Sequence, residues 1–205
     1  MLSAAARDAA GFLWSSGRLI FFARDALGTP PEHDGLGLRY ATPDDARRYA
    51  RDVGTESPRT FRLRLTSSTR CLLVLEGDRI LHSSWVTEGD AWTVELRRYV
   101  SPPPNEAYVY ESLTQTDARG RGLYPLALKW ICHDAAQNFE RVWVGVEDDN
   151  VPSLKAVTKA GFQEALSVDF RRRLGRTTLR LEAAAGENER PRLNVSHHPA
   201  RVRKP

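Results

Sequence analysis

The chain has 205 residues, of which 41% are apolar and 27% are charged. This balance is typical of a globular protein, and it excludes a fibrous repeat, a wholly disordered chain and a bundle of membrane-spanning helices. No apolar run approaches the ~18 residues that a transmembrane helix needs, so we expect no membrane partner. Arg7 and Asp8 interrupt the apolar stretch 1–16, which therefore does not predict a signal peptide.

The formal net charge is +4, and most of it lies toward the C-terminal end. Residues 184–205 hold five Lys or Arg against two Asp or Glu, which leaves residues 1–183 close to neutrality. We therefore expect one domain over 1–183 and a basic, flexible tail over 184–205, and we expect no nucleic acid as main partner. Cys71 and Cys132 are far apart, which excludes a disulfide scaffold and a cysteine-based metal site and is typical of a cytoplasmic protein.

Hydrophobic periodicity and turn residues predict helices and hairpins first, and then an alternation of strands and helices. Helices are expected over 4–14, 42–53, 123–138 and 151–159, with a short helix or extended piece over 58–65. Strands are expected over 18–23, 71–75, 80–86, 91–96, 107–114, 141–146, 162–173 and 176–181, and a loop over 28–37. This order predicts an α+β fold with a single mixed, mostly antiparallel sheet flanked by helices.

The segment TQTDARGRGLYP, residues 114–125, leaves a predicted strand and enters a predicted helix. Gly120 and Gly122 let the backbone turn with positive φ and approach a ligand closely. The amides that follow would have no acceptor within the helix, and a helix N-terminus favours an anion. Pro125 agrees, because proline is tolerated in a first helical turn. The segment predicts a pyrophosphate site, and the other interpretation is an ordinary glycine-containing turn with exposed arginines.

A second motif, NVPSLKAVTKAGF, follows at residues 150–162. Together the two segments resemble the Gcn5-related N-acetyltransferase (GNAT) superfamily, over about residues 110–165. The phosphate-loop motif of that family matches at Arg119 and Gly122, and its second motif matches at Asn150, Ser153, Lys159, Gly161 and Phe162. Either motif alone is weak. Both motifs in this order, with an amphipathic helix and the strand RVWVGV between them, are fairly specific.

The resemblance implies that the family's strands four and five, here 108–114 and 141–146, splay apart and admit the pantetheine of acetyl-CoA. It implies acetyl-CoA (acyl-CoA) as co-substrate, and we expect no metal. The implied contacts are the backbone of Leu113, Thr114 and Gln115 for the pantetheine amides, the loop residues Arg119, Gly120, Arg121, Gly122, Leu123 and Tyr124 for the pyrophosphate, and Asn150 and Ser153 for the pantetheine arm.

Glu111 is the predicted general base, because it lies on the motif strand near the expected position of an amine. Tyr108 and Tyr110 are alternatives. A strand carboxylate paired with an arginine is the other interpretation of Glu111.

The general acid is an open role. In the family it is often a tyrosine seven residues after the motif asparagine, and this chain has Val157 there. Ser153, which we also expect to be catalytic, or Tyr124 would have to replace it, or water would deliver the proton.

These features predict an N-acetyltransferase that moves an acetyl (acyl) group from acyl-CoA to an amine by direct attack. The acceptor, a small molecule or a peptide, would depend on residues 28–37 and 88–104, and Trp85 or Trp92 could line its site. Two alternatives are an acyltransferase that uses an acyl-carrier protein or a long-chain acyl donor, and a non-catalytic acyl-CoA-binding module.

Overall fold

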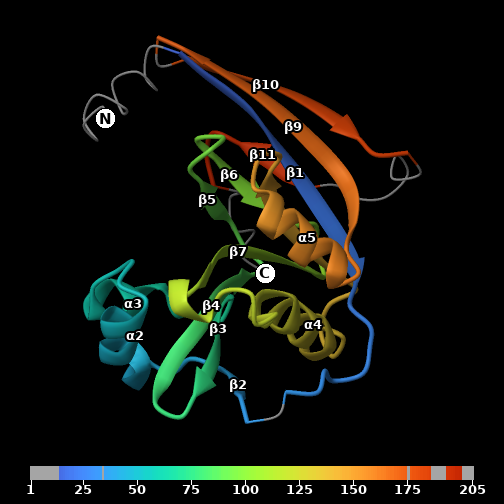
Figure 1. Cartoon of the computed structure of the whole chain (residues 1–205). Coiled ribbons are helices and arrows are strands. Elements are labelled where there is room, and N and C mark those ends of the chain that lie inside the picture. The colour runs from blue at the N-terminus through green and yellow to red at the C-terminus, as the bar shows by residue number, and fades with distance from the viewer. Residues whose placement is uncertain (1–13, 34, 175, 186–192, 200–205) are drawn as a thin grey trace.

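The computed structural model describes residues 14–33, 35–174, 176–185 and 193–199 (Figure 1). Its strands are β1 (Trp14–Asp25), β2 (Gly37–Tyr40), β3 (Thr69–Glu76), β4 (Arg79–Thr87), β5 (Ala91–Thr93), β6 (Arg98–Ser101), β7 (Glu106–Thr114), β8 (Arg141–Glu147), β9 (Gln163–Arg173), β10 (Arg176–Ala183) and β11 (Asn194–Ser196). Its helices are α2 (Ala46–Asp52), α3 (Pro58–Arg64), α4 (Leu123–Ala135) and α5 (Val151–Lys159). The helix expected over 4–14 lies outside the described residues, except for Trp14, which begins β1.

Local sequence sets the start of α3 and of α5. The Ser57 side chain accepts a hydrogen bond from the Thr60 amide at the start of α3, and the Asn150 side chain accepts one from the Ser153 amide at the start of α5. Each helix has proline within its first two positions, where no amide is needed. These caps fix where α5 begins, directly after the end of β8.

The main sheet has the strand order β10-β9-β1-β8-β7-β4-β3-β2 in the described part of the chain. All its strand pairs are antiparallel except β7 with β8, which run parallel. The predicted mixed, mostly antiparallel sheet with flanking helices is therefore confirmed.

The sheet separates two layers, because successive side chains of a strand point to opposite faces. On one face α4 and α5 pack against Leu72, Val109 and Val144. On the other face α2 and α3 pack against Leu73 and its neighbours on β3 and β4. A second sheet, β11-β6-β5, covers the rest of that face beside β1, β8 and β9.

This second sheet is an addition to the single predicted sheet, and one of its strands comes from within the predicted tail 184–205. Residues Asn194–Ser196 form β11 and pair with β6, and Leu193 is buried in the core against the main sheet. Residues 186–192 and 200–205 of the predicted tail lie outside the described residues. The pairing joins distant parts of the sequence, so local periodicity could not reveal it.

The N-terminal strand β1 is longer than the predicted strand 18–23, and it lies inside the sheet between β8 and β9 (Figure 1). Its first residues, 14–16, show no apolar alternation, but they pair along residues 171–173 of β9. β2 begins at Gly37, the last residue of the predicted loop, and pairs with β3. Both strands are fixed by distant partners.

Candidate active site

The parallel strands β7 and β8 separate halfway along their length. They pair from Glu106 with Arg141 as far as Val109 with Val144. Beyond this point β7 has a bulge, in which Glu111 adopts φ +47° and the register against β4 shifts. A bulge bends a strand and ends its pairing on one side. The predicted splay is therefore present, and it opens a gap between β7 and β8.

A groove of about 690 Å³ leads away from this gap along the end of β7 and between the starts of α4 and α5. Most of the residues predicted to contact the co-substrate line it, namely Leu113, Thr114, Arg119, Gly120, Gly122, Leu123, Tyr124, Asn150 and Ser153. Gln115 and Arg121 are not among the lining residues. The structure thus brings nine of the eleven predicted binding residues to one concave surface.

In the turn before α4 the backbone amides are available to a ligand, as the sequence predicted. Gly120 and Gly122 have φ of +79° and +76°, and a Cβ at either position would meet no atom within 4 Å. Among the described residues, none of the amides of 120–124 donates a hydrogen bond. Because a helix N-terminus carries partial positive charge, this turn can hold a phosphate group.

Three cations surround this turn, and a fourth faces elsewhere. Arg119, Lys155 and Lys159 line the groove, and no ion pair joins them to an acid within the described chain. The Arg121 side chain instead pairs with Glu76 at 2.7 Å. The contribution of Arg121 to the site is therefore limited to its backbone, whereas Lys155 is a groove residue that the sequence analysis missed.

Strand pairing decides which backbone groups of β7 face the groove. The Gln115 amide donates to the Leu81 carbonyl of β4 at 2.9 Å. Since backbone groups alternate in direction along a strand, those of Leu113 also point to β4, whereas those of Ser112 and Thr114 point into the opening. The Gln115 side chain donates to the Asp52 carbonyl, away from the groove. Of the three residues predicted to offer backbone contacts, only Thr114 directs its backbone groups into the opening, and Ser112 directs its own there as well.

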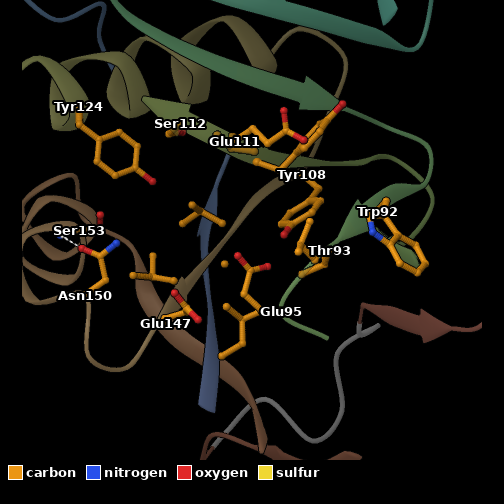
Figure 2. A pocket seen from close by; sticks show the side chains of 17 residues that line it. Trp92, Thr93, Glu95, Tyr108, Glu111, Ser112, Tyr124, Glu147, Asn150 and Ser153 are labelled. Carbon is orange, nitrogen blue, oxygen red and sulfur yellow. Dashed lines mark hydrogen bonds between the residues drawn. The ribbon is translucent and has the colours of Figure 1, made fainter. Parts of the chain in front are cut away.

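A second cavity, of about 230 Å³, lies on the other side of the splay (Figure 2). Glu95, Glu111 and Glu147 supply carboxylates to its lining, and Trp92 and Tyr108 supply aromatic surface. Trp92 is 46% exposed at one side of the cavity. Desolvation by burial, together with the Glu95 carboxylate and those of Asp149 and Asp148, raises the pKa of Glu147. Trp92 lines this cavity, whereas Trp85 is buried in the core.

The groove and the acidic cavity meet at four residues that line both, namely Ser112, Tyr124, Asn150 and Ser153. Figure 2 shows the Tyr124 ring reaching into this space from α4, opposite Asn150 and Ser153. A molecule lying in the groove would therefore present its end to a molecule in the cavity at this junction. The residues 28–37, expected to shape the acceptor site, do not line the cavity, whereas the β5–β6 segment within 88–104 does.

Glu111, the predicted base, is held in an ion pair. Its carboxylate accepts from Arg64 at 2.7 Å, and Arg64 also pairs with Glu56 and lies 3.9 Å over the Trp85 ring. This contact agrees with the arginine-paired interpretation of Glu111. Burial raises the pKa of Tyr108, which makes that alternative base less suitable as well.

The carboxylates of Glu147 and Glu95 are the better candidates for a base, and the sequence analysis missed both. Glu147 ends β8 and begins a run of three acids, residues 147–149. Glu95 lies between β5 and β6, in a segment without a readable motif. Strand order alone brings them to one cavity. Val157, at the family's tyrosine position, is fully buried among α4 and the sheet.

The architecture matches solved structures. The chain aligns with a protein described as a GNAT-family acetyltransferase from Novosphingobium aromaticivorans, with a TM-score of 0.55, 18% identity, and coverage of 83% of this chain and 66% of that one. A GCN5-related N-acetyltransferase from Sphaerobacter thermophilus matches with a TM-score of 0.55, 13% identity, and coverage of 87% and 56%. The chain has the GNAT fold. A GNAT-family acetyltransferase from Colwellia psychrerythraea agrees, with a TM-score of 0.53, 13% identity, and coverage of 89% and 64%.

This chain spans about two thirds or less of the length of these GNAT-fold structures. Neither protein-family models nor curated proteins gave a match to the sequence. Within the described residues, no helix is both long and apolar enough to cross a bilayer. The same part of the chain holds no cluster of three or more His, Cys, Asp or Glu side chains that could bind a metal ion.

Proposed function

We propose that the protein is an acyl-CoA-dependent N-acyltransferase, most simply an acetyltransferase, that acts on a cationic amine. The observation that carries the proposal is the junction at the β7–β8 splay, where a groove with free backbone amides meets an acidic, aromatic cavity. The GNAT fold supports the reaction class. The fit to acetyl-CoA is supported by the open space at Gly120 and Gly122 and by the unpaired cations beside them.

The donor would lie in the groove, held by groups of three kinds. The amides of 120–124 would bind the pyrophosphate, and Arg119, Lys155 and Lys159 would add positive charge around it. The outward backbone groups of Ser112 and Thr114 would bond the pantetheine amides as an added strand would. This arrangement would leave the thioester at the junction, where an amide of β7 can stabilise the oxyanion.

The acidic cavity would hold the acceptor amine. Glu147 would take a proton from the ammonium group, since its pKa is raised and a carboxylate with a raised pKa is a more effective base near neutral pH. Glu95 lines the same cavity and is the alternative base. The free amine would then form a C–N bond to the acyl carbon, and the C–S bond would break. The Trp92 face beside the carboxylates favours a cation further along the acceptor, because cations bind over indole rings.

Thiol release tests the proposal. Acetyl-CoA would be incubated separately with spermidine, with a lysine-containing peptide and with a primary amine that carries no second charge. We expect faster release of the CoA thiol with the first two amines. Glu147→Gln should lower the turnover ~100-fold or more, the range of a general base. Asp148→Asn is the matched control, because it removes a neighbouring charge that does not line the cavity. Absence of thiol release and of acetylated product with every amine would refute the proposal and would fit a non-catalytic acyl-CoA-binding module.

The donor could also be carried on a protein. Arg119, Lys155 and Lys159 at the groove would suit the acidic surface of an acyl-carrier protein, which presents the same pantetheine arm. A loaded carrier protein should then displace acetyl-CoA in a competition experiment. If CoA binding is unaffected by saturating carrier protein, free acyl-CoA is the donor.

A further inference from the structure

The proposed reaction needs a proton at the leaving sulfur, and the fold provides few groups that can deliver it. Val157 on α5 lines neither the groove nor the cavity, because it is buried against α4 and the sheet. Of the four residues at the junction, Ser112, Tyr124 and Ser153 carry hydroxyl groups. Figure 2 shows the Tyr124 hydroxyl pointing into the shared space from the start of α4.

Tyr124 packs against a series of hydrogen-bonded side chains, Thr114, His82, Ser84 and Ser112, which we call the polar chain. Its ring stacks on the imidazole of His82, with centroids 5.4 Å apart and 28° between the planes. His82 Nδ1 lies 2.7 Å from Thr114 Oγ1, and His82 Nε2 lies 2.8 Å from Ser84 Oγ. Ser84 Oγ lies 2.7 Å from Ser112 Oγ. This polar chain of side chains therefore runs from Thr114 to His82, which stacks on the Tyr124 ring, and on through Ser84 to Ser112.

The chain has one protonation pattern that directs every donor toward Tyr124. His82 is 1% exposed, and burial lowers its pKa to about 3, so its ring is neutral, with one donor and one acceptor nitrogen. With the proton on Nε2, the imidazole donates to Ser84, Ser84 donates to Ser112, and Nδ1 accepts from Thr114. Ser112 then donates to the Tyr124 oxygen, with which its side chain interacts. The phenolic proton is left free to face the junction.

We propose that Tyr124 gives its phenolic proton to the departing thiolate, and that His82, through Ser84 and Ser112, positions the Tyr124 hydroxyl for this transfer. The inference rests on the proposed acyl transfer. Collapse of the tetrahedral intermediate breaks the C–S bond, and the sulfur takes the proton from Tyr124. The phenolate takes the proton that the newly bonded nitrogen must lose, so Tyr124 ends as it began. Ser112 stabilises the phenolate in between.

The state of Tyr124 in the free protein agrees with this role. Burial raises the pKa of Tyr124 to about 12, while the interaction with the Ser112 side chain lowers it in part. The hydroxyl is therefore protonated across the neutral range. Ser153 lacks such support: its amide donates to the Asn150 side chain, and within the described residues no hydrogen bond joins its hydroxyl to this polar chain.

The first test replaces the hydroxyl and keeps the ring. In the thiol-release assay with acetyl-CoA and spermidine, Tyr124→Phe should lower kcat ~100-fold or more and leave the Kd for acetyl-CoA within twofold. Tyr40→Phe is the matched control, because Tyr40 also packs on α4 and loses one hydrogen bond, to Asp134, far from the groove. Its kcat should stay within twofold of the wild type.

The second test separates positioning from mere packing. Ser84→Ala interrupts the chain, and we expect kcat to fall about tenfold in the wild-type background and to stay unchanged in the Tyr124→Phe background. A structural role would lower kcat by the same factor in both backgrounds. Wild-type turnover in Tyr124→Phe, or equal effects of Ser84→Ala in both backgrounds, would overturn the inference alone. An inactive wild-type protein would instead overturn the proposed function.

Discussion

Arg64 connects the second cavity to the core, and its loss gives a stability change that can be worked out from the structure. Its guanidinium lies over Trp85 and pairs with Glu111, which is 51% exposed, and with Glu56, which is 6% exposed. Within the described part of the chain, Glu56 Oε2 has no hydrogen-bond partner. Arg64→Met would leave the buried Glu56 carboxylate without its compensating charge, whereas Glu111 would return to water at little cost.

The magnitude follows from the protonation of Glu56. Desolvation by burial already raises its pKa in the presence of Arg64. Without Arg64 the folded protein would keep Glu56 neutral, and protonating a glutamate of ordinary pKa costs ~1.4 kcal/mol per pH unit above about 4.3. We therefore expect a loss of at most about 3.7 kcal/mol in the free energy of unfolding at pH 7, because the raised pKa of Glu56 already costs the wild type part of this energy. Because the folded pKa is raised, the loss shrinks as the pH falls, to at most about 1 kcal/mol at pH 5.

Urea denaturation at pH 7 and pH 5 measures both values. Arg70→Met is the matched control, because Arg70 also lies over a ring, 4.3 Å from the Tyr40 centroid, and pairs with an acid, Asp134, that is partly exposed. It should cost less than about 1 kcal/mol at either pH. Adding Glu56→Gln to Arg64→Met should remove most of the pH dependence. Equal losses at the two pH values, or no excess over Arg70→Met, would refute the reasoning.

Three further results are expected. Glu111→Gln should lower kcat less than tenfold, because Arg64 already holds that carboxylate, and a loss above ~100-fold would restore Glu111 as the base. Leu193→Ala should lower the free energy of unfolding by about 2 kcal/mol, since Leu193 is 4% exposed against the main sheet, whereas an unchanged denaturation midpoint would show that β11 is not docked. The pH profile of kcat/KM should fall on the acid side through a pKa above the ordinary glutamate value, and Glu147→Gln should abolish this limb; a limb that persists in Glu147→Gln would exclude Glu147.

The sequence was most informative where structure is local. Periodicity and turn residues placed α4 and α5 well, over 123–138 and 151–159, because these signals act within a few residues. The turn at Gly120 and Gly122 was predicted for the same reason. These local features also carried the resemblance to the GNAT family, and with it the splay of β7 from β8.

Features that depend on distant pairing could not be predicted. The choice between Gln115 and Ser112 as a backbone contact depends on the register of β7 against β4, and the bulge at Glu111 interrupts that register. The position of β11 and the meeting of Glu95 with Glu147 depend on which strands become neighbours. The environment of His82 could not be predicted, because its partner Thr114 and the partner of Ser84, Ser112, lie on another strand.

Isothermal titration with acetyl-CoA tests the central claim most directly. We expect micromolar binding by the wild type and a loss of 100-fold or more in Gly122→Trp, where the indole would fill the space before the free amides. Gly77→Trp is the matched control and should bind acetyl-CoA with wild-type affinity. Like Gly122, Gly77 has positive φ and open space beside it, but it lies in the β3–β4 turn and not at the groove. No heat with the wild type, or equal affinities in all three proteins, would contradict the assignment of the groove to an acyl-CoA.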